Sequence, residues 1–184
     1  PGPCQIVSSW SLESPGDVFP WTDGFDNLAH VSIQDRPHDE VAVVARGQVE
    51  TKDTHGVLPA DDGLSPLIFL RETPYTCIEG DIQGLAEPLR SKSDNDGPLP
   101  ALHGLMDAVG EALTYEPGHT DVKSNAAQAL KHGRGVCQDH AHLFIAGCRV
   151  LGVPARYVSG YLLAGQDNDS HLASHAWAEA FVDG

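Results

Sequence analysis

The segment from Gly133 to Leu151 constrains the fold more than any other part of this 184-residue chain. It begins Gly-Arg-Gly-Val-Cys-Gln-Asp-His-Ala-His, continues as a mostly apolar stretch, and is followed by Gly152-Val153-Pro154. Within it, small or apolar residues recur at the spacing of one buried helix face. These residues are Cys137, Ala141, Phe144, Ile145 and Cys148. The sequence therefore predicts a helix that is packed against a core and carries Cys137 on its first turn.

Two strands are predicted to follow this helix. Residues 153–163 alternate in polarity and are rich in Tyr and Val, as expected for a strand. After a polar loop over 165–170, residues 174–182 place every second side chain on one face, namely His175, Trp177, Glu179 and Phe181. A helix packed against an antiparallel hairpin is an α+β arrangement, and we expect this fold class.

The part of the chain before this segment divides into two regions. Short extended pieces at 5–10, 28–33 and 41–51, separated by Pro, Gly and Asp clusters, predict a β-rich front module. Further on, apolar spacing predicts a helix over 99–115, and Ser124 is the expected N-cap of a second helix that ends at Gly133. The polar stretch 91–100, which leads into the first of these helices, is expected to be a loop.

Charge and hydropathy exclude several classes of function. The net charge is −15, with −11 in residues 1–100 and −4 in the remainder, so nucleic acids and anionic membranes are poor partners. The longest apolar runs are far shorter than the roughly 20 residues that a membrane span needs. We expect a soluble protein whose compartment stays open, with the cytoplasm favoured. The residues from Pro1 onward show no charged-then-apolar signal pattern, but the first residue is not Met, so this says little about export.

Cys137 has the surroundings of a reactive thiol. Glycines at 133 and 135 leave room for a substrate, and the free amides and dipole of a helix N-terminus favour a thiolate. Cys148, three turns deeper on the same face, is expected to be a small core residue. Asp139 has a structural explanation, because an acidic residue in the first turn accepts hydrogen bonds from loose amides.

A metal centre and a cofactor are not expected. His140 and His142 are two residues apart on the predicted helix, so their side chains point about 200° apart and cannot share one ion with Cys137. No zinc-protease or deaminase motif is present, and Gly133-Arg134-Gly135 is only a fragment of a phosphate-binding loop.

Three ordered segments together resemble the bacterial transglutaminase-like superfamily, whose members are often described as cysteine proteases. The segments are Gly135 to Asp139, Gly152 to Tyr161 and Ser174 to Glu179. The resemblance implies a papain-like core over 74–184, preceded by a β-rich N-terminal region over 1–73. It also implies a Cys-His-Asp triad. Asp183 falls in the turn after the His175 strand, so we expect the triad Asp to lie beyond Gly184 and both ends of the chain to be trimmed.

The resemblance assigns Cys137 as the nucleophile and His175 as the general base. The backbone amide of Cys137 is a natural oxyanion donor, while the second donor stays open. Gln138, Tyr161 and Trp177 are candidate cleft-lining residues, although aromatic residues on paired strands also commonly belong to a core.

The function expected is acyl transfer through a Cys137 thioester on a peptide or protein substrate, with hydrolysis favoured over cross-linking. The alternative is a module that keeps the same fold and binds peptides or proteins without catalysis.

Overall fold

The computed structural model describes residues 4–59, 63–164 and 171–182 and divides into two compact units, Pro1–Leu64 and Ser65–Gly184. Each unit is described by itself. The domain limits of 1–73 and 74–184 expected from the sequence stay a prediction, because compactness alone does not define an independently folding domain. Among the described residues, no helix is long and apolar enough to span a membrane.

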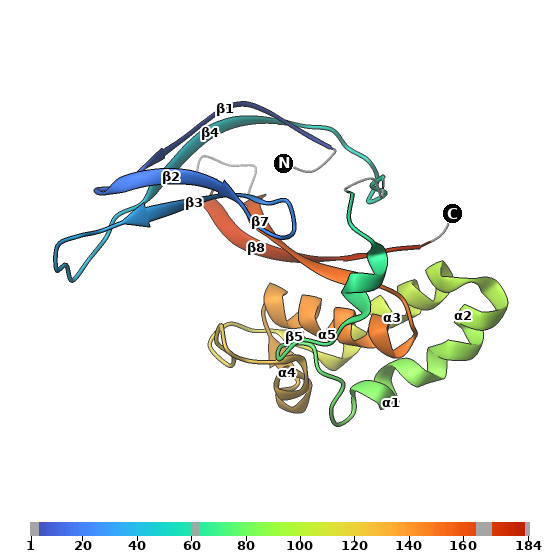
Figure 1. The fold of residues 1–184 in the computed structure, drawn as a ribbon. Coiled ribbons are helices and arrows are strands. Elements are labelled where there is room, and N and C mark those ends of the chain that lie inside the picture. The colour runs from blue at the N-terminus through green and yellow to red at the C-terminus, as the bar shows by residue number, and fades with distance from the viewer. Residues whose placement is uncertain (1–3, 60–62, 165–170, 183–184) are drawn as a thin grey trace. The chain divides into compact units, whose positions relative to one another are not determined.

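The first unit consists of two antiparallel strand pairs (Figure 1). In one pair, β1 (Gln5–Glu13) lies against β4 (Val44–Thr51), and in the other β2 (Asp17–Thr22) lies against β3 (Leu28–Ile33). The turn between β2 and β3 is held by the Asp23 carboxylate, which accepts hydrogen bonds from the amides of Phe25 and Asn27 at 2.8 and 2.9 Å. The predicted front strands are present, and β2 is an additional one.

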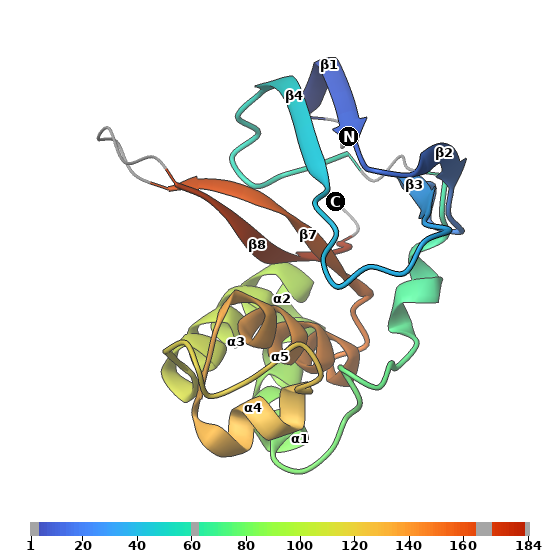
Figure 2. The same cartoon turned by 90° about the vertical axis from the view of Figure 1, so that its left-hand side faces the viewer.

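The second unit contains the helices of the described residues. It begins with η1 (Pro66–Leu70), α1 (Ile82–Ala86), η2 (Glu87–Leu89), α2 (Arg90–Asp96) and α3 (Pro98–Ala112). It continues with β5 (Thr114–Tyr115), α4 (Ala126–His132), β6 (Arg134–Gly135) and α5 (Cys137–Val150). It ends with β7 (Ala155–Ala164) and β8 (His171–Ala180), an antiparallel pair that lies across the helices (Figure 2). The α+β fold class is confirmed.

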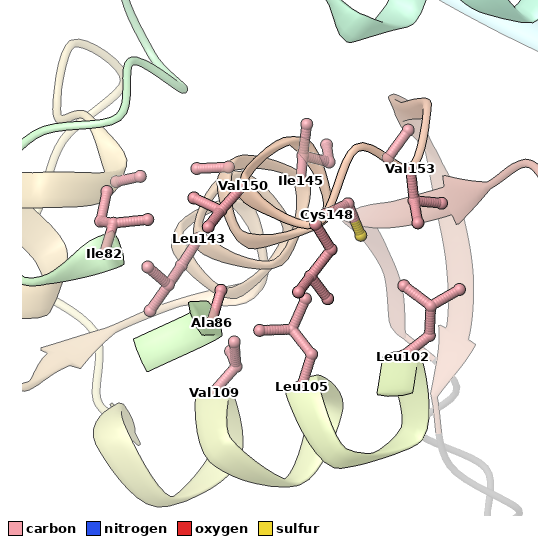
Figure 3. Close-up of a cluster of buried hydrophobic side chains, with 14 of the residues drawn as sticks. Ile82, Ala86, Leu102, Leu105, Val109, Leu143, Ile145, Cys148, Val150 and Val153 are labelled. Carbon is pink, nitrogen blue, oxygen red and sulfur yellow. The ribbon is translucent and has the colours of Figure 1, made fainter. Parts of the chain in front are cut away.

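The core of this unit forms around α5. Apolar side chains of α3 point toward α5, with Leu102, Leu105 and Val109 facing it in Figure 3. Gly147 allows the two helices to approach closely, since a Cβ at this position would lie 2.7 Å from Cδ1 of the fully buried Leu105. On its other side α5 packs against β8 and β7. The helix that carries Cys137 is therefore packed between α3 and the β7–β8 hairpin.

Two local expectations about the helices were wrong. Residues 90–96 form α2 rather than a loop, because Arg90 pairs with Glu87 at 2.6 Å and also donates to the Val150 carbonyl, while Gly97, at φ 86°, ends the helix. The N-cap of α4 is Asn125 instead of Ser124. Its side chain accepts from the amide of Gln128 at 2.9 Å, and the Gln128 side chain accepts from the Asn125 amide, which is a reciprocal capping box.

Candidate active site

Cys137 is the first residue of α5, and two short elements fix how the chain reaches it. Gly133 ends α4 in the left-handed region at φ 65°, and β6 then pairs in parallel with β5. The helix begins immediately afterwards, at residue 137. Cys137 is partly exposed, whereas Cys148 on the same helix is completely buried. The thiol at the start of the helix is therefore the accessible one of the two.

Asp139 holds the first turn of α5 from within. Its carboxylate is fully buried, and Oδ2 accepts hydrogen bonds from the amide of Val136 at 2.7 Å and from the hydroxyl of Thr120 at 2.6 Å. Gly135 makes room for this carboxylate, because a Cβ there would lie 2.6 Å from Cβ of Asp139. The buried aspartate thus caps the helix and faces away from solvent.

The β7–β8 hairpin presents His175 opposite Gly160 in the strand register. The rings of His175 and Trp177, two residues apart on β8, meet edge to face with centroids 4.7 Å apart. A Cβ at Gly160 would lie 3.2 Å from the Trp177 ring, so the glycine gives the indole its place across the strand pair. His175 is half-buried beside this ring.

An open depression of about 380 Å³ lies where the start of α5 meets the hairpin. Four of the five residues predicted from the sequence line it, namely Cys137, Gln138, Tyr161 and His175. The fifth, Trp177, is absent from this lining and instead contacts the ring of His175. The remaining lining residues are Tyr157, Ser159, Gly160, Ser174 and Ala176. The catalytic roles of Cys137 and His175 stay predictions at this point.

Gln138 is anchored at the rim of the depression. Its side-chain nitrogen donates to the carbonyl of Asp121 at 2.7 Å, which ties the first turn of α5 to the loop before α4. This contact gives Gln138 a structural function in addition to its place in the lining.

His142 and Tyr157 form a contact that the sequence did not reveal. The His142 ring contacts two tyrosine rings, with its centroid 5.4 Å from that of Tyr75 and 5.0 Å from that of Tyr157. Its Nδ1 is buried and has no hydrogen-bond partner among the described residues. The alternation of side chains along a strand predicts that Tyr157 and Tyr161 share one face of β7. It does not predict the contact between Tyr157 and His142, which depends on how α5 packs against β7.

Burial and charge shift the ionisation of several groups around the depression. Burial lowers the pKa of His142, which favours the neutral imidazole. Burial is also the main cause that raises the pKa of the Tyr157 phenol, and the negative charges of Cys137 and Asp139 raise it further. Burial raises the pKa of the Cys148 thiol to about 12, so that thiol stays protonated.

His140 and His142, near the start of α5, make contacts with different groups. His140 places Nδ1 3.0 Å from the Val136 carbonyl and Nε2 3.2 Å from the Leu113 carbonyl, whereas His142 lies in the tyrosine stack. Within residues 4–59, 63–164 and 171–182, no group of three His, Cys, Asp or Glu side chains is placed to hold a metal ion. The loop 165–170 lies outside the described residues.

Comparison with known proteins identifies the family. Residues 83–184 match the family model of the transglutaminase-like superfamily. The chain therefore belongs to this superfamily, whose members are typically thiol-dependent enzymes. An uncharacterised protein of Mycobacterium leprae is 31% identical over 166 residues, which cover 80% of this chain and 57% of that protein. An uncharacterised Mycobacterium tuberculosis protein is 38% identical over 86 residues, 44% of this chain and 27% of that protein.

A solved structure shares the fold. It is a candidate cysteine protease from Cytophaga hutchinsonii with a TM-score of 0.70 and 21% identity, and the match covers 99% of this chain and 64% of that one. The chain spans less than two thirds of the length of each of these three proteins. The similarity in structure shows that the two proteins share this α+β fold.

Proposed function

We propose that this protein is a thiol-dependent acyl-transfer enzyme that acts on amide bonds of peptides or proteins, with Cys137 as nucleophile and His175 as general base. The observation that carries the proposal is that Cys137, at the start of α5, and His175, on β8, line one open depression. Membership of a family of thiol-dependent enzymes supports the same chemistry.

In the proposed reaction the Cys137 thiolate attacks the amide carbonyl and forms a C–S bond. The backbone amide of Cys137 donates a hydrogen bond to the oxyanion of the tetrahedral intermediate. The C–N bond then breaks as the His175 imidazolium protonates the leaving amine, which leaves a thioester on Cys137. Water attacks the thioester, His175 accepts its proton, and the carboxylic acid departs with the Cys137 thiolate restored.

We favour water over an amine as the acyl acceptor. The depression is open, and Ser159 and Ser174 in its lining are exposed, so water reaches the thioester without a dedicated channel. Acyl transfer to an amine would need a second binding site that holds the amine against competition from solvent.

The experiment uses p-nitrophenyl acetate, an activated ester that reports acylation without requiring the natural substrate. We expect an acetyl group on the peptide that contains Cys137, detected by mass spectrometry, and a burst of nitrophenolate. Cys137→Ser should abolish both signals, whereas the matched control Cys148→Ala should keep them, because Cys148 is buried. Absence of acetyl-Cys137 would refute the enzyme proposal and leave a binding module.

The choice of acceptor is tested on the same acyl-enzyme. Its breakdown is followed with and without added methylamine, and the products are separated as acetate and N-methylacetamide. Hydrolysis predicts release that hardly depends on the amine. Release that rises steeply with methylamine concentration would favour amine transfer instead.

A further inference from the structure

The second oxyanion donor is the part of the proposed reaction that the sequence leaves open. Three hydroxyl-bearing side chains alternate along β7 and line the depression, namely Tyr157, Ser159 and Tyr161. Their spacing of two residues places them on the same face of the strand. They differ in how firmly the surrounding structure holds them.

Of the two tyrosines among these three residues, Tyr157 is the one for which the described residues show a ring contact. It contacts the ring of His142 on α5 with a centroid separation of 5.0 Å and an interplanar angle of 35°, and the His142 ring also stacks with that of Tyr75 at 5.4 Å. Tyr157 is 41% exposed and Tyr161 63% exposed. Because oxyanion stabilisation depends on donors that are fixed before the reaction, Tyr157 is better suited to the role than Tyr161.

We propose that Tyr157 is a catalytic residue that donates a second hydrogen bond to the oxyanion at Cys137, and that His142 is a positioning residue that holds the Tyr157 ring. The inference rests on the proposed function. The backbone amide of Cys137 supplies one donor and the Tyr157 hydroxyl the other, so that the developing negative charge is met from α5 and from β7.

The ionisation of the two rings agrees with these roles. Burial, reinforced by the negative charges of Cys137 and Asp139, raises the pKa of the Tyr157 phenol, so that the hydroxyl keeps its proton. Burial lowers the pKa of His142, so that the imidazole stays neutral and brings no cation into the tyrosine stack. Since Nδ1 of His142 has no hydrogen-bond partner among the described residues, the ring is held by stacking.

Two reactions of the same thiol separate an oxyanion donor from a residue that activates Cys137. Acylation by p-nitrophenyl acetate passes through an oxyanion, whereas alkylation by iodoacetamide is a displacement at a saturated carbon and does not. We expect Tyr157→Phe to slow acylation by about 10²–10³-fold, the usual cost of one oxyanion donor. It should leave the alkylation rate and the apparent KM for the ester unchanged. The matched control Tyr115→Phe, made on a tyrosine that contacts the ring of His140 but does not line the depression, should leave acylation near the rate of the unmodified protein.

His142 is tested by removing its ring and by conserving it. His142→Ala deletes the ring that contacts Tyr75 and Tyr157 and should slow acylation while alkylation persists. His142→Phe keeps an aromatic ring in the stack and should restore most of the acylation rate. Equal acylation rates for His142→Ala and the unmodified protein would overturn the positioning role.

The outcomes for Tyr157 are distinct from those for the proposed function. If the unmodified protein forms no acetyl-Cys137, the proposed function fails and the role of Tyr157 fails with it. If the unmodified protein is acylated and Tyr157→Phe is acylated equally fast, only the role of Tyr157 is refuted. Equal slowing of acylation and alkylation would also refute it, because the tyrosine would then act on the thiol instead of the oxyanion.

Discussion

A single methyl group at Gly135 should disrupt the turn on which Cys137 lies. The Cβ added by Gly135→Ala would lie 2.6 Å from Cβ and 2.7 Å from Oδ2 of Asp139, closer than such contacts occur. The Asp139 side chain is completely buried and is attached to the first turn of α5, so it has little room to yield. We therefore expect its carboxylate to lose its present position.

The cost follows from the two hydrogen bonds that this carboxylate accepts. Losing the bond from the Val136 amide, at 2.7 Å, removes a helix cap worth about 0.5–2 kcal/mol. Leaving the fully buried Asp139 carboxylate without the Thr120 donor, now at 2.6 Å, adds about 1–3 kcal/mol. These contributions overlap, and together they predict a loss of about 2–4 kcal/mol in the free energy of unfolding.

The assay is urea unfolding with the slope compared between variants, and α3 supplies the matched control. A Cβ at Gly110 meets nothing within 4 Å, so Gly110→Ala should gain about 0.5–1 kcal/mol from helix propensity alone. Gly135→Ala should also change the rate at which iodoacetamide modifies Cys137, whereas Gly110→Ala should not. Unfolding free energies that are equal for Gly135→Ala and the unmodified protein would refute the reasoning.

Three further predictions concern the same helix. Gly147→Ala should overpack the α3–α5 contact, because the new Cβ would lie 2.7 Å from Leu105, and we expect a lower urea midpoint and a cost of about 1–3 kcal/mol. In the folded protein iodoacetamide should modify Cys137 but not Cys148, whose thiol is buried and has its pKa raised to about 12; mass mapping that finds native Cys148 labelled would contradict the described core. Burial lowers the pKa of folded His142 below its ordinary value of 6.5, so the unfolded chain binds the proton more readily and stability should fall as pH drops below about 6.5; His142→Phe should flatten this dependence in urea titrations between about pH 7 and pH 5.

The elements that the sequence predicts well are those with a strong local pattern. Small and apolar residues at helical spacing place α5 at 137–150, and alternation with Tyr and Val places β7. In both cases the side chains along one element report which face is buried. The prediction that Cys137 lies on the first turn of α5 is confirmed, since the helix begins at this residue.

The elements that were missed have no strong local pattern of their own. β2 contains Pro20, which cannot donate to a ladder, and it forms by pairing with β3 in a sheet of only two strands. α2 is polar throughout and is stabilised where Arg90 reaches the carbonyl of Val150 on α5. The contact between Arg90 and Val150 joins residues 60 positions apart, so no pattern within a short window encodes it.

The same distinction applies to the site. Cys137 and His175 stand out in the sequence because their chemistry is recognisable without a partner. Tyr157 and His142 do not, since an aromatic residue on a strand and a histidine on a helix are most often core residues, and only the packing of α5 against β7 stacks them. Residues that position a reacting group are therefore harder to predict than the group itself.

The distribution of charge around Cys137 bears on how an acidic protein could stabilise an anionic intermediate. The chain carries a net charge of −15, and a carboxylate beside the thiol would oppose both thiolate and oxyanion. Among the described residues that line the depression there is no Asp or Glu, and Asp139, two residues after Cys137, is turned inward, where its carboxylate accepts hydrogen bonds from Val136 and Thr120. The groups that face the depression are instead neutral hydroxyls, aromatic rings and an amide. No carboxylate therefore lines the described depression, although the charge of the inward-turned Asp139 still contributes to raising the pKa of Tyr157 in that lining.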